Sequence, residues 1–235
     1  DGGTRSAFSR TSLYSMPFAN SMYSLEKNVH SVSLDLNTRL SNSLSNQFLA
    51  TFSKIDDVRG SNSAEFPFID IQDGTNTNTQ YMSLGYELFS YNNAVHNNIF
   101  NLKDELIYTT GRHKITGVVS YEYQMADNQY MRNGTGYYRY GSVDDFINGA
   151  APEVVCLTYG YGGDNDPKAR VAFNKAGIYA QDEWNATKNF KLTYGLRLDG
   201  LFFDNGDLMT NKAIYDLNYG GRHIDTGKWP NAQVS

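Results

Sequence analysis

Residues 190–199 alternate between apolar and polar side chains with almost no exception. One parity is apolar and consists of Phe190, Leu192, Tyr194, Leu196 and Leu198. The other parity is mostly polar and consists of Lys191, Thr193, Gly195, Arg197 and Asp199. Because successive side chains of a strand point to opposite faces, this pattern predicts a strand with one apolar and one polar face.

The strand at 190–199 is predicted to be the second half of a hairpin. In the preceding stretch, Ile178, Ala180 and Trp184 share an apolar parity. The polar segment 185–189, Asn-Ala-Thr-Lys-Asn, has the composition of a hairpin turn. Ten residues at about 3.3 Å each, tilted by about 40–45°, cover about 24 Å along a bilayer normal. The hairpin is therefore long enough to cross a membrane.

The same reasoning along the chain predicts an all-β fold of antiparallel strands. The six predicted strands are 29–40, 45–53, 98–108, 113–124, 172–184 and 190–199. Short turns at 41–45, 109–112 and 185–189 close three hairpins, and long loops are predicted at 54–97, 125–171 and 200–235. Transmembrane β-barrels of the outer membrane have short periplasmic turns and longer extracellular loops. We therefore expect the short turns in the periplasm and the long loops outside the cell.

Two features interrupt the long loops. Residues 66–71, Phe-Pro-Phe-Ile-Asp-Ile, form an apolar patch that is either a short strand or an apolar contact. Ser142, followed three residues later by Asp145, resembles a capping box, and Gly149 is well placed to end a helix. A short helix is therefore predicted at 142–148.

Composition excludes several classes of protein. No apolar run approaches the about 20 residues of a membrane-spanning helix. The net charge of -5 carries no basic stripe, which argues against nucleic-acid binding. Cys156 is the single cysteine, so no disulfide can form within the chain. The first residues have no apolar signal-peptide core, so we expect a mature chain or a piece of a longer one.

No catalytic motif stands out, and neither an enzymatic activity nor a cofactor is expected. The four histidines are scattered without metal-ligand spacing, at positions His30, His96, His113 and His223. Asp164 and Asp166 could hold calcium through their oxygens. A polar turn ahead of Pro167 explains the same residues, and we favour that interpretation.

The second long loop concentrates aromatic and basic side chains, which are the candidate ligand-binding residues: Arg132, Tyr137, Tyr138, Arg139, Tyr140, Tyr159 and Tyr161. Tyrosine rings and guanidinium groups can grip sugars, peptides or anionic chelates. The same residues could instead pack the loop on itself. The sequence leaves these two roles equally open.

The hairpin sequences IYAQDEW and FKLTYGLRLD resemble a barrel hairpin of TonB-dependent outer-membrane receptors. The resemblance is closest to the Bacteroidetes Oar-like type, in which a carboxypeptidase-regulatory-like domain precedes the barrel. Further matches lie at 66–71, 111–117, 144–149 and 229–235, and the last segment resembles the approach to another strand. Together they cover most of the chain from about Val29 onward.

This resemblance implies that the chain is part of a larger barrel, of 22 strands with a plug in its lumen. The implied function is energised uptake of a ligand across the outer membrane. The implied partners are outer-membrane lipid, the TonB complex acting through the plug, and a surface lipoprotein; the resemblance does not identify the ligand. Two alternatives stay open, a passive outer-membrane porin and a surface-exposed β-rich adhesin.

Overall fold

The computed structural model describes residues 5–6, 14–75, 79–229 and 233–234. Six long strands dominate it: β3 (Met22–Arg39), β4 (Leu44–Ser61), β7 (Ala94–Thr110), β8 (His113–Gln129), β11 (Lys168–Thr187) and β12 (Phe190–Asp204). Each range predicted from the alternation lies inside its strand to within one residue, and every strand is longer than predicted. The extra length was missed because the apolar pattern stops before the backbone pairing does. At 54–59 of β4, for example, charged residues occupy both faces.

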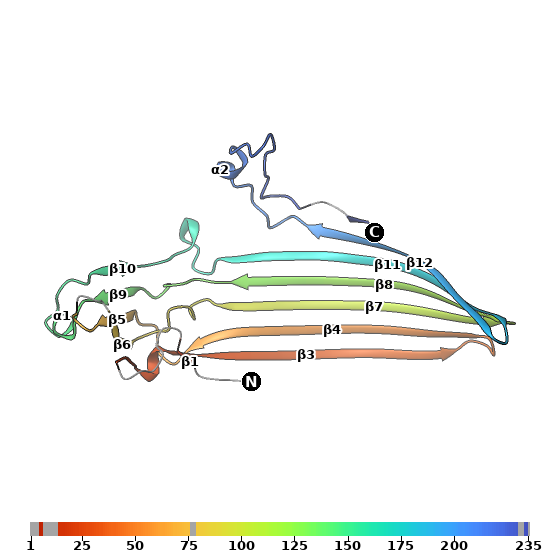
Figure 1. The fold of residues 1–235 in the computed structure, drawn as a ribbon, viewed down its shortest axis with the longest axis horizontal. Helices are drawn as coiled ribbons and strands as arrows, with labels where there is room; N and C mark the ends of the chain where they lie inside the picture. Colours follow the sequence, from red (N-terminus) through yellow and green to blue (C-terminus); the bar gives the residue numbers. More distant parts are fainter. Residues whose placement is uncertain (1–4, 7–13, 76–78, 230–232, 235) are drawn as a thin grey trace. The chain divides into compact units, whose positions relative to one another are not determined.

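The long strands belong to one sheet of order β1-β3-β4-β7-β8-β11-β12-β13, and Figure 1 shows them side by side. The outermost strands are two residues each, β1 (Arg5–Ser6) on β3 and β13 (Gln233–Val234) on β12. Consecutive long strands form the three predicted hairpins, and β13 lies in the segment expected to lead to a further strand. Residues 230–232 and 235 of that segment are outside the described residues.

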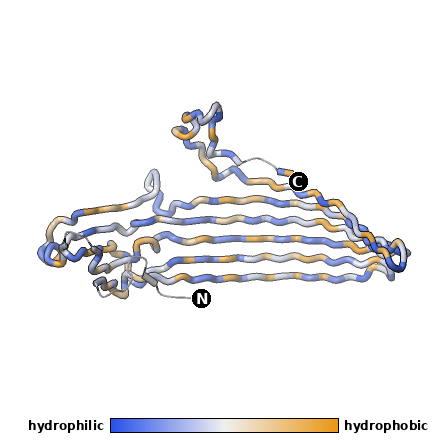
Figure 2. The backbone as a smooth tube through the Cα atoms, viewed as in Figure 1, coloured by the Kyte–Doolittle hydropathy of each residue, from blue (hydrophilic) through white to orange (hydrophobic). Residues whose placement is uncertain are grey.

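The register of hairpin β11–β12 separates its two faces. Apolar cross-strand pairs join Ile178 with Leu198, Ala180 with Leu196, and Trp184 with Leu192. The alternate pairs are polar and join Gly177 with Asp199, Tyr179 with Arg197, and Glu183 with Thr193. Figure 2 shows hydrophobic and hydrophilic residues alternating along the long strands. The sheet therefore has one apolar and one polar face in this hairpin, as the sequence predicted.

The hairpin turns are short, as predicted, and they are shorter than the predicted ranges because the strands extend into 109–110 and 185–187. Two residues join β7 to β8, Gly111 and Arg112, and two join β11 to β12, Lys188 and Asn189. Gly111 has a φ of +57°, which a residue with a Cβ rarely adopts. The glycine thus allows a tight reversal between two strands of 17 residues each.

A second, smaller sheet consists of β2 (Met16–Pro17), near the start of the chain, and four strands that lie within segments predicted as long loops. Its order is β10 (Val154–Cys156), β9 (Tyr137–Tyr140), β5 (Phe68–Gln72), β6 (Gln80–Leu84) and β2. Pairs β10–β9 and β5–β6 are antiparallel, whereas β5–β9 and β2–β6 are parallel. The prediction of continuous loops at 54–97 and 125–171 was therefore wrong. These strands are two to five residues long, and the parallel pairs β5–β9 and β2–β6 join segments far apart in the sequence, so the strands leave little periodicity in it.

Two short α-helices and two 3₁₀ helices, η1 (Ala19–Ser21) and η2 (Tyr161–Gly163), complete the described elements. Helix α1 (Val143–Ile147) begins at the predicted capping box, where the Ser142 side chain accepts a hydrogen bond from the Asp145 backbone amide. Helix α2 (Lys212–Tyr215) lies in the segment 200–235, which was predicted as a loop throughout. It was missed because it is a single turn with no apolar stripe. Among the described residues, no helix has the length and apolar character needed to span a membrane.

The contacts of the chain define two compact units. Unit 1 comprises residues 1–28, 55–96 and 127–169, and it includes the small sheet. Unit 2 comprises residues 29–54, 97–126 and 170–235, and it includes most of hairpin β11–β12.

Candidate ligand-binding site

The core of unit 1 forms around β5, the apolar patch at 66–71. All five residues of this strand are buried, and Phe68 and Ile71 are each 2% exposed. Phe68 packs with Leu88 and Tyr137, and the rings of Phe68 and Tyr137 stack with centroids 6.0 Å apart. Residues 68–71 of the patch therefore form a strand, whereas Phe66 lies outside it and is 48% exposed.

Asp70 is a buried carboxylate at the centre of this strand, and two of the candidate ligand-binding residues hold it. Its Oδ2 accepts hydrogen bonds from the Tyr137 hydroxyl at 2.6 Å and from Arg139 Nε at 3.1 Å. Burial, and then the hydrogen bond to Asp70, raise the pKa of Tyr137. Tyr137 and Arg139 thus stabilise the small sheet by hydrogen-bonding one oxygen of a buried carboxylate, whereas Asp70 Oδ1 has no hydrogen-bond partner among the described residues.

Of the remaining candidate residues, some pack against neighbouring side chains and others are exposed. Tyr140 packs edge-on against Phe146 of α1, with centroids 5.2 Å apart, and Arg132 lies 5.1 Å from the ring centroid of Phe89. Tyr138, next to Tyr137 in β9, pairs with Val155 of β10. Tyr159 and Tyr161, by contrast, are 79% and 96% exposed. These two tyrosines are the candidate residues whose rings are open to a ligand.

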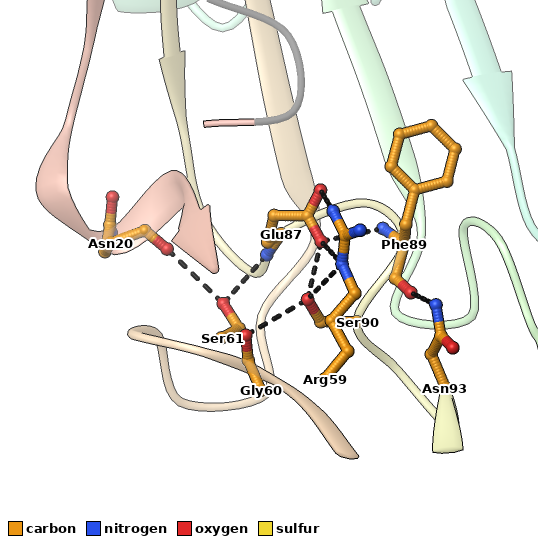
Figure 3. Close-up of polar contacts among 8 residues, drawn as sticks. All are labelled: Asn20, Arg59, Gly60, Ser61, Glu87, Phe89, Ser90 and Asn93. Atoms are coloured by element: carbon orange, nitrogen blue, oxygen red, sulfur yellow. Dashed lines mark hydrogen bonds and ion pairs between the residues drawn. The ribbon is translucent and has the colours of Figure 1, made fainter. Parts of the chain in front are cut away.

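An ion pair that the sequence analysis did not identify links β4 to the segment after β6 (Figure 3). The Glu87 side chain is fully buried and meets Arg59 through two bonds, Nη2 to Oε1 at 2.9 Å and Nε to Oε2 at 3.1 Å. Glu87 Oε2 also accepts from the Ser90 hydroxyl at 2.5 Å and from the Phe89 backbone amide at 3.1 Å. The guanidinium carbon of Arg59 lies 3.5 Å from the ring centroid of Tyr23. Both Glu87 carboxylate oxygens and two of the three Arg59 guanidinium nitrogens are therefore hydrogen-bonded.

The sequence held one signal for this pair. Glu87 is a lone charge in the otherwise apolar and aromatic run 84–89, Leu-Gly-Tyr-Glu-Leu-Phe, and a charge in such a run needs a partner when buried. The partner itself could not be predicted, because Arg59 lies 28 residues away with no spacing rule to connect the two.

Asp164 and Asp166, the weak calcium candidates, take part in a local turn. Asp164 Oδ1 accepts from the Asp166 backbone amide at 2.9 Å, and Asp166 Oδ1 accepts from Gln129 Nε2 at 2.5 Å. Lys168 lies 3.6 Å from the other Asp166 oxygen. Within the residues that the structure describes, no group of three His, Cys, Asp or Glu side chains is placed to hold a metal ion.

The polar face of the large sheet in unit 2 carries ordered ion pairs. Glu183 meets Lys191 of β12 and lies 3.5 Å from Lys114 of β8. Arg197 donates to both Asp199 oxygens, at 2.6 and 2.8 Å. Charges of both signs thus line this face, as expected of a wall that contacts water.

Near the short turn, the apolar face of the same hairpin carries a charged residue, Asp182. Its Oδ2 accepts a hydrogen bond from the Tyr194 hydroxyl at 2.9 Å and lies 2.7 Å from His113 Nδ1. His113 in turn stacks on Trp184, with centroids 5.8 Å apart and planes at 3°. The charge is therefore surrounded by aromatic side chains at one end of the apolar face, the arrangement found where a membrane meets water.

Comparison with known proteins supports the interpretation of this sheet as part of an outer-membrane barrel. The family described as outer membrane beta barrel domain matches residues 4–221. The crystal structure of the outer membrane transporter YddB from Escherichia coli is similar in fold, with a TM-score of 0.50 at 13% sequence identity. The likeness covers 81% of this chain and 23% of the transporter chain. No curated protein matches the sequence.

Proposed function

Because this chain belongs to the outer membrane beta barrel domain family and lies in the outer membrane, we propose that it forms part of the wall of a TonB-dependent receptor that takes up a ligand with energy from the inner membrane. The observation that carries the proposal is a sheet with six long strands, each of 15 to 20 residues, with short turns and, in hairpin β11–β12, alternating faces. Outer-membrane transporters larger than simple porins enclose a plugged lumen with such strands. The resemblance of IYAQDEW and FKLTYGLRLD to receptor hairpins supports the same assignment.

In the proposed receptor, the apolar face of hairpin β11–β12 contacts lipid and the polar face lines the lumen. Leu196 and Ile178, which are 84% and 56% exposed, would be covered by lipid. The parent barrel would have 22 strands, an Oar-like architecture and a plug outside the present chain. The TonB complex would act through that plug, and a surface lipoprotein would assist capture. The chain itself would serve ligand transport and would have no catalytic role.

The candidate ligand-binding residues fit this proposal unevenly. Tyr159 and Tyr161 present free aromatic faces in the long segment between β8 and β11, where a ligand could first be captured. Tyr137 and Arg139 hold Asp70, so we assign them to the stability of that segment. Unit 1 would then be a folded capture region formed by the segments between hairpins.

Energy dependence distinguishes this proposal from the porin and adhesin alternatives. We expect a strain without the full-length protein and a strain without TonB to leave the same solute in the growth medium, as measured by mass spectrometry of spent medium. A passive porin would deplete that solute without TonB. An adhesin would leave solute depletion unchanged in both strains, and its loss would instead reduce attachment.

The two ends of β11 should lie on opposite sides of the membrane. A cysteine at Lys188, in the short turn, should resist an impermeant thiol reagent on intact cells, whereas a cysteine at Tyr161 should react. Tyr161 is preferable to Gly163, two residues further on, whose φ of +83° would strain a cysteine. The background variant is Cys156→Ala, since Cys156 packs against the apolar core of unit 1. Labelling at position 188 and protection at position 161 would invert the proposed topology.

A further inference from the structure

A groove of about 710 Å³ lies on unit 2, against the ends of β11 and β12 that are far from their short turn. Three adjacent strands supply the side chains that matter: Glu122 of β8, Phe173 and Lys175 of β11, and Asp199, Leu201 and Phe203 of β12. Strand β13 closes one side through Gln233, which pairs with Leu201. The groove is therefore built from regular strands, which hold side chains more firmly than loops do.

The register places the β11 and β12 side chains on the polar face. Phe173 pairs with Phe203, Lys175 with Leu201, and Gly177 with Asp199. These three pairs are spaced by two residues, so they share a face, and it is the face that carries Arg197 and Glu183. In the proposed receptor this face lines the lumen, so the groove would be open to a passing ligand.

One wall of the groove is aromatic. The rings of Phe173 and Phe203 lie with centroids 6.0 Å apart, and Trp229 stacks on Phe203 at 5.4 Å with planes at 21°. The position of Trp229 is fixed by a hydrogen bond, which its backbone amide donates to Asn205 Oδ1 at 3.0 Å. An apolar side chain of a ligand would find a preformed surface here.

Charges of opposite sign adjoin this wall. On the polar face, Lys114 and Lys191 form ion pairs with Glu183, and Arg197 forms an ion pair with Asp199. Across the described ranges, by contrast, neither Lys175 nor Glu122 makes a side-chain hydrogen bond or ion pair. Lys175 interacts electrostatically with Asp199 but forms no ion pair with it in the described residues. A cation and an anion without direct contacts beside an apolar wall are complementary to a ligand with both charges and an apolar side chain.

We propose that this groove binds a zwitterionic ligand of the amino-acid or short-peptide class. Its carboxylate would meet Lys175, its ammonium would meet Glu122, and its apolar side chain would pack against Phe173 and Phe203. A neutral sugar would use the aromatic wall but neither charge. The inference rests on the proposed function, because it names the class of ligand that passes along the lumenal face.

Binding can be measured without energised uptake. Trp184 and Trp229 are the only two tryptophans, so the variant Trp184→Phe of the full-length protein reports from Trp229 alone. In detergent, the free dipeptide phenylalanyl-leucine should change Trp229 fluorescence saturably. The N-acetylated, C-amidated dipeptide, which lacks both charges, should bind at least tenfold more weakly.

Variants locate the site. Lys175→Met should weaken dipeptide binding at least tenfold, and Glu122→Gln should do the same. The matched control is Lys191→Met, on the same face but paired with Glu183, which should change affinity less than twofold. Circular dichroism confirms folding of each variant.

Three outcomes would overturn the inference: equal binding of the blocked dipeptide, a saturable response to maltose instead of the dipeptide, or no saturable response at all. None of them bears on energy dependence, which the TonB experiment tests. Uptake that requires TonB together with any of these results would retain the proposed receptor and reject the zwitterionic ligand.

Discussion

Replacing Arg59 by methionine should destabilise the segment after β6 by about 3–5 kcal/mol, because it leaves the fully buried carboxylate of Glu87 without its cation. The loss also removes the contact of the guanidinium group with Tyr23. Hydrogen exchange measured by mass spectrometry on the full-length protein should show faster exchange in peptides covering 84–93. Peptides covering β11 and β12, in unit 2, should exchange at their usual rates.

Two further variants separate burial of a charge from loss of a contact. Lys27→Met removes a partner from an exposed pair, in which Lys27 Nζ lies 3.4 Å from Asp57, and should cost less than about 1 kcal/mol. The double variant Arg59→Met with Glu87→Met removes both charges and should recover part of the loss. Unchanged exchange in Arg59→Met would mean that the pair does not hold unit 1 together.

The long hairpins were predictable because their physics is local. Where one face of a sheet contacts an apolar environment and the other contacts water, the side chains of each strand alternate with a period of two. The sequence from Phe190 to Leu198 shows this alternation directly. The short turns followed from composition for the same reason. Strand ends such as Lys54–Arg59 were missed, because side chains outside an apolar environment need not alternate.

The small sheet could not be predicted because its pairing is non-local. Strand β5 lies parallel to β9, with Phe68 opposite Tyr137, although 69 residues separate them. Nothing in the local sequence of either strand specifies that partner. The division of the tyrosines follows from the same pairing: Tyr137 became a core residue when β9 joined β5, and Tyr161 stayed exposed. The sequence identified the aromatic residues but not their separate roles.

A charge placed on the apolar face of hairpin β11–β12 should have the second large effect. Leu196→Arg should cost about 2–4 kcal/mol of folding free energy in lipid vesicles, because Leu196 is on the apolar face and lies about midway between the ends of β12. Its side chain is 84% exposed in this chain, so the cost would come from placing a charge in lipid and not from a disrupted protein core. Folding of the full-length protein can be followed by urea titration in vesicles.

The adjacent position provides the control for that measurement. Arg197→Leu changes the opposite face, where Arg197 is hydrogen-bonded to Asp199, and removes a charge from the lumen instead of adding one to lipid. Its cost should be much smaller than that of Leu196→Arg, since an exposed ion pair contributes little. Equal penalties at positions 196 and 197 would contradict the assignment of the apolar face to lipid. A larger penalty at 197 would reverse the two faces, and with them the lumenal position of the Lys175 groove.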